Sequence, residues 1–154
     1  MKKINFLLII LFGLLITNCG YHPILLKKNL NFNISDIQSN GDKRINDKIS
    51  KNLRKFKKNI DTKRNLKIVI SSKKDTTVII KDERGNDSRF LLKINIRLQI
   101  FDGEILIKDE NFNKDFAYNS LQSKLDLSQY KKQIEEVLIN KIIEEIFIFI
   151  YSIK

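Results

Sequence analysis

The stretch from Phe90 to Ile100 constrains the fold of this chain more than any other. Apolar residues stand at every second position and polar residues stand between them: Phe90, Leu92, Ile94, Ile96, Leu98 and Ile100 on one side, Lys93, Asn95, Arg97 and Gln99 on the other. Successive side chains of a β-strand point to opposite faces, so this period of two predicts a long strand with one buried face. The rest of the chain must cover that face.

Neighbouring segments extend this strand into a sheet. Asp102-Gly103 predicts a two-residue hairpin, and a return strand begins at Ile105. The apolar positions of the return strand then change parity, which predicts a bulge near Lys108 to Asn111. Upstream, residues 65–72 and 76–80 are rich in branched apolar residues and predict either two strands or one merged strand.

One more strand and two helices complete the predicted architecture. Residues 30–35 alternate like a half-buried strand, and Ser39 to Asp42 predicts a turn that ends in a helix cap. The first helix carries an apolar stripe, and the second follows a loop at residues 121–126 with Asp126 as its cap. The stripes are Ile45, Ile49, Leu53 and Phe56 in the first helix, and Ile134, Leu138, Ile142 and Ile146 in the second. We therefore expect an α+β fold of order β-α-β-β-β-α, with two helices packed on one face of a largely antiparallel four- to five-stranded sheet.

The last helix has two further features. Its end, Ile146 to Tyr151, is apolar all round, which fits either a buried helix end or a surface covered by a membrane or protein partner. The carboxylates of Glu135, Glu136, Glu144 and Glu145 alternate with lysines and are predicted to lie on the solvent side.

A catalytic site is not visible in the sequence. His22 is the one histidine of the chain and lies three residues from the one cysteine, Cys19. Enzymes need convergent titratable groups, and the known catalytic and phosphate-binding motifs are missing. The sequence therefore predicts no enzyme, no metal site and no cofactor apart from a covalent lipid.

The N-terminus has the organisation of a bacterial lipoprotein. Lys2 and Lys3 precede an apolar run from Ile4 to Ile16, which is too short to span a membrane and suits a signal peptide. Ile16-Thr17-Asn18-Cys19 resembles a lipobox, with Asn18 in place of the usual small residue. We expect a signal peptide at residues 1–18, lipid on Cys19, a tether at residues 19–29 and one folded domain at residues 30–154. The alternatives are an uncleaved anchor or a buried free cysteine.

The net charge indicates which kinds of partner the chain could bind. The formal net charge is +11, which suggests an anionic partner such as nucleic acid, membrane headgroups or a phosphorylated glycolipid. Nucleic acid is set aside because export conflicts with it and no recognition motif is present. An AT-rich genome, which favours lysine, asparagine and isoleucine codons, would account for part of the charge.

These pieces, in their order, resemble LptE, the lipopolysaccharide-assembly lipoprotein of Gram-negative bacteria, in its alphaproteobacterial form. The matching residues are Cys19-Gly20-Tyr21-His22-Pro23, Arg44 with Leu53-Arg54, Asp82 to Phe90, the alternating strand, Asp102-Gly103 and Tyr118-Asn119-Ser120. The resemblance covers essentially the whole chain after the signal peptide, although each motif alone is weak.

The resemblance implies a function. Members of this family plug the outer-membrane β-barrel LptD and help deliver lipopolysaccharide to the outer leaflet, lipid-anchored on the periplasmic side. It further implies lipopolysaccharide contact at two loops, where the nearest basic residues are Lys81, Arg84 and Arg89 in the first and Lys124 in the second. The alternatives are solvated surface charges at these positions and, for the whole chain, an outer-membrane adaptor of another envelope complex.

Overall fold

The computed structural model describes residues 32–56 and 64–153. The elements follow the predicted order β-α-β-β-β-α, and residues 65–81 form one merged strand. They are β1 (Asn33–Gly41), α2 (Lys43–Leu53) with the short 3₁₀ turn η2 (Arg54–Phe56), β2 (Asn65–Lys81), β3 (Asp87–Asp102), β4 (Ile105–Asn119) and α3 (Lys124–Tyr151).

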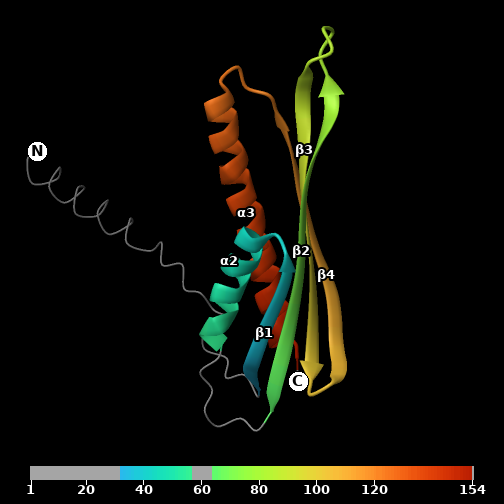
Figure 1. The fold of residues 1–154 in the computed structure, drawn as a ribbon, viewed down its shortest axis with the longest axis vertical. Helices are drawn as coiled ribbons and strands as arrows, with labels where there is room; N and C mark the ends of the chain where they lie inside the picture. Colours follow the sequence, from blue (N-terminus) through green and yellow to red (C-terminus); the bar gives the residue numbers. More distant parts are fainter. Residues whose placement is uncertain (1–31, 57–63, 154) are drawn as a thin grey trace, which may run out of the picture.

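The four strands form one sheet in the order β1-β2-β3-β4. β2, β3 and β4 are antiparallel to one another, whereas β1 pairs parallel with β2. The parallel pair arises because α2 lies between β1 and β2 in the chain, and parallel neighbours need such a crossover. Both helices lie on the same side of the sheet (Figure 1). The predicted fold class is confirmed.

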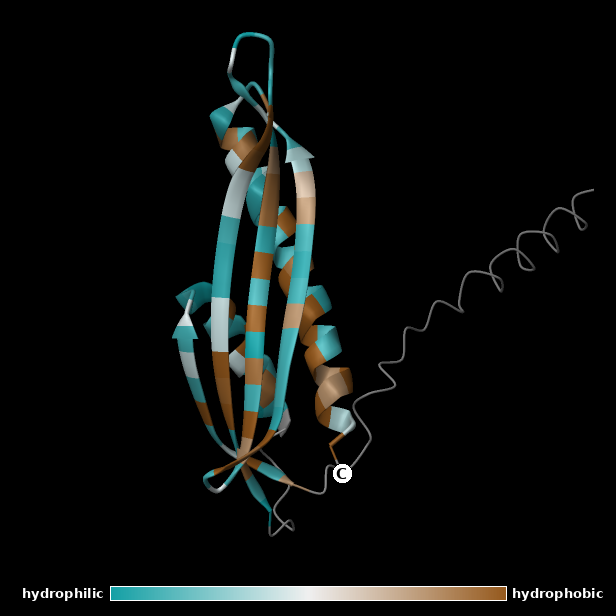
Figure 2. Cartoon of the chain, turned by 90° about the vertical axis from the view of Figure 1, so that its right-hand side faces the viewer, coloured by the Kyte–Doolittle hydropathy of each residue, from teal (hydrophilic) through white to brown (hydrophobic). Residues whose placement is uncertain are grey.

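The alternation in β3 produces the core. Leu92, Ile94, Ile96, Leu98 and Ile100 are all buried, while the residues between them are more exposed. Figure 2 views the sheet from the side away from the helices and shows this alternation as successive hydrophobic and hydrophilic bands along the strands. The buried faces of the two helices complete the same core, as the apolar stripes predicted.

The backbone at Gly41, just before α2, lies in close contact with β2. β1 continues to Gly41, which replaces most of the turn expected from Ser39 to Asp42. Gly41 has φ +97°, and a Cβ at this position would lie 1.9 Å from the carbonyl oxygen of Ser72 on β2. Asp42 caps the helix as predicted, because its side chain accepts from the backbone N–H of Ile45 at 3.1 Å.

The hairpin between β3 and β4 is present, one residue later than predicted. Asp102 pairs with Ile105, so the two loop residues are Gly103 and Glu104. Gly103 has φ +60°, which only glycine adopts readily at the first position of a primed turn. The bulge lies at Ile107, next to the predicted range, because Ile100 pairs with Lys108 and Phe101 with Leu106.

The last helix begins earlier than predicted. Ser123 is its cap and accepts from the backbone N–H of Asp126 at 3.2 Å, so Asp126 lies in the first turn and is not the cap. Asp126 is favourable there because the helix dipole is positive at this end. At the other end Ile146 and Ile150 are fully buried and Ile148 is exposed, which favours the buried helix end. Among residues 32–56 and 64–153, no helix combines the length and apolar character needed to span a membrane.

Candidate functional site

The fold gathers the predicted glycolipid-contacting residues at one end of the molecule. Lys81 ends β2, Arg84 lies in the turn that follows, and Arg89 lies near the start of β3. Lys124 is the first residue of α3, and the β2–β3 hairpin and the start of this helix lie at the same end (Figure 1). The backbone joins the two segments directly, since the N–H of Ser120 donates to the carbonyl of Ser88 at 2.8 Å. We call these four basic residues the basic end, and all of them are exposed. The same two segments also carry four exposed acidic residues, Asp82, Glu83, Asp87 and Asp126, which offset the formal charge.

The loop that presents Arg84 is ordered by its own side chains. Asp82 accepts from the backbone N–H groups of Arg84 and Asn86 at 2.9 and 2.8 Å, and from the Asn86 side chain at 3.1 Å. The side-chain and backbone hydrogen bonds from Asn86 are the main causes that lower the pKa of Asp82. Gly85 has φ +81°, which closes the turn. Asp82 is therefore occupied within the loop, whereas Glu83, Arg84 and Asp87 are exposed to solvent.

Apolar side chains lie exposed at the same end. Val78, Ile79 and Ile80 near the end of β2 are each at least 40 % exposed, and Leu121 and Leu125 flank the start of α3. Exposed apolar residues beside positive charges are the combination that an anionic amphiphile requires. The sequence pattern had marked residues 76–80 only as a strand, because the exposure of its end depends on how the other elements pack around it.

A second feature was not predicted: an ionic cluster between the helices and the sheet. Glu135 on α3 is 3 % exposed and lies 3.1 Å from Lys74 on β2 and 3.4 Å from Arg44 on α2. Glu136 beside it pairs with Arg44 at 2.5 Å and with Lys48. Lys74 also reaches Asp42 at 3.2 Å, so three acidic and three basic residues are joined across α2, α3 and β2.

Pairing within the cluster favours the charged forms of Glu136, Asp42 and Lys74. The side-chain hydrogen bond from Lys48, reinforced by Arg44, lowers the pKa of Glu136. Burial alone would raise the pKa of Asp42 and lower that of Lys74. The hydrogen bonds that Asp42 accepts and Lys74 donates outweigh burial, so the pKa of Asp42 is lowered and that of Lys74 is raised. The cluster is therefore a set of ion pairs that connects the two helices to the sheet.

The cluster corrects one prediction. Glu135 and Glu136 were expected on the solvent side of the last helix, yet Glu135 is buried and both pair with the first helix. Helical spacing carried a signal for this, since Glu135 lies four residues before the fully buried Ile139. The partners Arg44 and Lys74 could not be read from the sequence, because they come from other elements.

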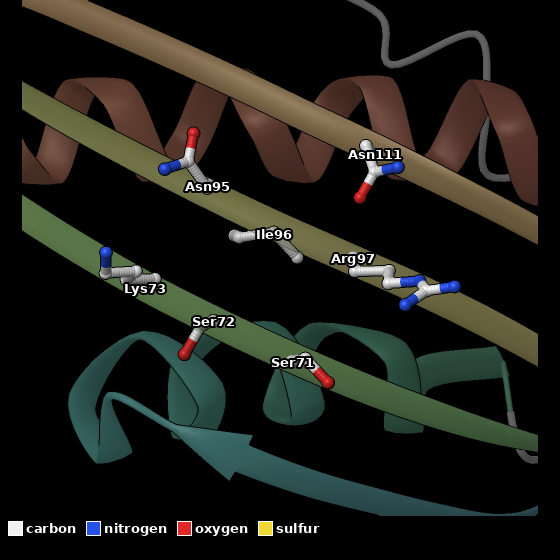
Figure 3. A pocket seen from close by; sticks show the side chains of 7 residues that line it. All are labelled: Ser71, Ser72, Lys73, Asn95, Ile96, Arg97 and Asn111. Atoms are coloured by element: carbon white, nitrogen blue, oxygen red, sulfur yellow. The ribbon is translucent and has the colours of Figure 1, made fainter.

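The sheet face away from the helices is open and polar. Figure 3 shows a shallow recess on β2, β3 and β4, about 210 Å³ in volume, lined by Ser71, Ser72, Lys73, Asn95, Ile96, Arg97 and Asn111. Arg97 makes a two-pronged pair with Asp109 on β4, at 2.8 and 2.6 Å. This hydrogen-bonded pairing raises the pKa of Arg97 and lowers that of Asp109. The charges of this face are therefore partly matched within the sheet.

Some predicted features cannot be placed. Cys19, the signal peptide at residues 1–18 and the tether at residues 19–29 lie outside the described residues. Within the part of the chain that the structure describes, no three histidine, cysteine or acidic side chains are grouped so as to hold a metal ion. The expectation that the chain is not an enzyme stays a prediction.

Comparison with known proteins identifies the fold. No protein-family model matches the chain, and no curated protein matches it in sequence. Solved structures that share its fold include a minor lipoprotein from Acinetobacter baumannii, a lipoprotein from Caulobacter crescentus and lipoprotein B from Nitrosomonas europaea.

The match to the Acinetobacter protein has a TM-score of 0.58 at 11 % identity and covers 75 % of this chain and 87 % of that one. The Caulobacter protein has a TM-score of 0.51 at 10 % identity, covering 74 % and 86 %. The Nitrosomonas protein has a TM-score of 0.50 at 10 % identity, covering 83 % and 88 %. The chain has the α+β fold of these small bacterial lipoproteins.

Proposed function

We propose that this chain is a non-enzymatic, lipid-anchored lipoprotein of the LptE type. Acyl chains on Cys19 hold it to the periplasmic side of the outer membrane. There it plugs and supports the translocon barrel LptD and assists the transfer of lipopolysaccharide to the outer leaflet. Three features support the proposal: the lipobox-like N-terminus, the order of motifs that resembles LptE, and a fold shared with bacterial lipoproteins.

The single observation that carries the glycolipid part is the basic end. Lys81, Arg84 and Arg89 are separated from Lys124 by 35 or more residues of sequence, yet all four belong to one end of the fold. Lipid A carries phosphates and acyl chains. Arginine pairs with phosphate oxygens through its planar fork, and the exposed apolar residues at the same end suit the lipid part.

Charge reversal at the basic end tests this part of the proposal. The double variant Arg84→Glu with Arg89→Glu should lower the binding of lipopolysaccharide at least tenfold, measured with the full-length protein. A matched control, Lys51→Glu with Arg54→Glu, changes the net charge equally but lies on α2 and η2, and should bind like the wild type. Equal weakening in both double variants would mean that only overall charge matters, and the basic end would be discarded.

Recovery of partners tests the barrel. Purification of the tagged chain from envelopes in mild detergent should recover LptD, and the double variant at the basic end should recover it equally well. Recovery of a different envelope complex would support the adaptor alternative. The anchor is tested separately, because a Cys19→Ala protein should lose palmitate labelling; retained labelling would place the lipid elsewhere.

A further inference from the structure

The strand β4 lies at the edge of the sheet, and β3 is its one neighbouring strand in the part of the chain that the structure describes (Figure 1). The backbone N–H of Ser120 donates to Ser88 on the β3 side. The direction of these groups alternates along a strand, so the register with β3 turns the odd-numbered residues from Asp109 to Asn119 outward. Their outward N–H and C=O groups are a template for another strand.

Two common protections of an edge strand are missing from most of β4. Residues Lys108 to Asn119 contain no proline, and their pairing with β3 has no register shift, since the bulge at Ile107 lies before them. Two of the charged side chains are engaged within the chain, because Lys114 pairs with Glu145 and Asp109 pairs with Arg97. A long edge strand without proline or a bulge can pair with another chain.

Exposed apolar side chains lie at both ends of β4. At its start, Ile105 is 70 % exposed and Leu106 is 45 % exposed. Near its end, Phe116 is 44 % exposed and lines, together with Val137 on α3, a recess of about 280 Å³. An antiparallel neighbour of the same sequence would bring the start of one β4 beside the end of the other. The two apolar ends would then cover each other, and this contact would occur twice.

The charges of β4 also match a second copy in the antiparallel direction. When the two strands are centred on Phe112, Glu110 faces Lys114 of the second copy, and twofold symmetry repeats this pair. The same register places Asp109 opposite Asp115. The charge of Asp109 is offset, because its carboxylate accepts from Arg97 at 2.8 and 2.6 Å.

The helix beside β4 presents an apolar residue near the same axis. Phe112 packs against Phe149 of α3, with ring centroids 5.8 Å apart, so this part of α3 lies near the centre of the pairing. Its neighbour Ile148 is 60 % exposed and stands seven residues after Lys141, which lines the recess at the edge of the sheet. Residues seven apart share one face of a helix. Ile148 therefore lies on the side of α3 that would face the α3 of a second copy.

We propose that two copies of this chain pair through β4 in the antiparallel direction, centred on Phe112, so that their sheets form one continuous sheet. The occupant of the edge is a second copy because the apolar ends and the Glu110–Lys114 pair are supplied by β4 itself. Backbone hydrogen bonds provide affinity, and the twofold axis doubles each side-chain contact. The inference goes beyond the proposed function and does not depend on the basic end.

Particle mass tests the pairing. The full-length protein in detergent micelles should contain two copies per particle when sedimentation is corrected for bound detergent. Asn113→Pro removes an outward N–H and leaves the bonds to β3 in place, so it should be monomeric with an unchanged circular dichroism spectrum. Asn113→Ala keeps the N–H and should remain dimeric. A monomeric wild type, which would leave the edge to a different chain, or a dimeric Asn113→Pro would overturn the inference.

Disulfide cross-linking reads the register without a proline. In the proposed pairing Asn111 faces Asn113 of the second copy, with Cα atoms about 5.5 Å apart, a separation that a disulfide spans. A mixture of Asn111→Cys and Asn113→Cys chains should form mixed disulfides at least fivefold more than a mixture of Gln38→Cys and Asn113→Cys. Gln38 is the matched control because it is exposed on the opposite edge strand, β1. Equal cross-linking in the two mixtures would overturn the inference.

Charge reversal tests the pair that repeats across the axis. Glu110→Lys would face Lys114 of the second copy and should weaken dimerisation at least tenfold, measured by dilution in the same micelles. Glu83→Lys makes the same change of charge at an exposed residue between β2 and β3, and it should dimerise like the wild type. Equal dimerisation of the two variants would overturn the proposed register. Recovery of LptD is measured separately, so failure of the dimer leaves the proposed function standing.

Discussion

Lys74 on β2 and Glu135 on α3 form an ion pair in which Nζ lies 3.1 Å from Oε1, across the interface between sheet and helix. The two side chains are 27 % and 4 % exposed, so most of the carboxylate is removed from water. A buried charge is tolerated only when it is paired and hydrogen-bonded. This pair therefore adds a polar contact to the apolar packing of α3 on the sheet.

Removal of the buried carboxylate should destabilise the fold. Glu135→Gln leaves Lys74 and Arg44 facing a neutral amide, and we expect the free energy of unfolding to fall by about 1–3 kcal/mol. This is less than for a fully buried pair because both bases keep some contact with solvent. Denaturant titration checks the value. Glu144→Gln, exposed on the same helix, should change it by less than about 0.5 kcal/mol.

Acid should weaken the same cluster through Glu136. Its pKa is lowered from 4.5, first by the hydrogen bond from Lys48 and then by that from Arg44. The unfolded chain then binds this proton more readily than the folded one, so the stabilisation is present above 4.5 and is lost as the pH falls through the lowered value.

Unfolding titrations over a pH series measure this effect. The wild type should lose stability on acidification more steeply than Glu136→Gln, because the amide cannot take up the proton. Glu144→Gln should follow the wild-type slope. Parallel curves for wild type and Glu136→Gln would show that the Lys48 and Arg44 pairs do not contribute.

Two glycine substitutions separate backbone strain from a steric clash. Gly41→Ala would place Cβ 1.9 Å from the Ser72 carbonyl oxygen in a left-handed conformation, which forces β1 away from β2. Gly85→Ala has the same kind of backbone conformation, with φ +81°, but open space around it. We expect Gly85→Ala to cost about 1–2 kcal/mol in the free energy of unfolding. Gly41→Ala should cost clearly more, and equal costs would contradict the clash.

The helix cap can be assigned by two substitutions. Ser123→Ala removes the side-chain acceptor for the Asp126 N–H and should lower the free energy of unfolding by about 1 kcal/mol. Asp126→Asn keeps that N–H and removes only the favourable charge in the first turn, so a loss of about 0.3–1 kcal/mol is expected. Thermal unfolding of the two variants gives the order. A larger loss for Asp126→Asn would restore Asp126 as the main contributor at this helix end.

Local sequence chemistry predicted most of the fold. The alternation from Phe90 to Ile100 predicted the central strand and its buried face, and the stripe led by Ile45 predicted the first helix with its cap at Asp42. These predictions held because both periods are properties of a single element. Residues 65–72 and 76–80, predicted as either two strands or one merged strand, form the single strand β2. Errors occurred at two boundaries: the hairpin shifted by one residue, and the cap lies at Ser123 instead of Asp126. At each of these places several residues satisfy the same local rule.

How the helices and strands pack against one another could not be predicted from these local patterns. Spacing alone placed Glu135 on a solvent face, because lysines stand near it in the sequence and its partners Arg44 and Lys74 lie on other elements. The parallel pairing of β1 with β2 was also outside the prediction, because the direction in which β1 joins the sheet depends on how the connecting helix α2 packs on it. These contacts join residues that are distant in the chain, and no local pattern encodes them.

For the candidate site, too, the sequence and the tertiary structure determine different properties. The sequence by itself determined the class of each residue that we propose as functional: a cysteine after an apolar leader, and arginines and lysines in two loops. Only the tertiary structure decided that Arg89 and Lys124 share one end of the molecule. The physical reason is that charge and hydrophobicity belong to single residues, whereas a site is made by the packing of α3 along the edge of the sheet.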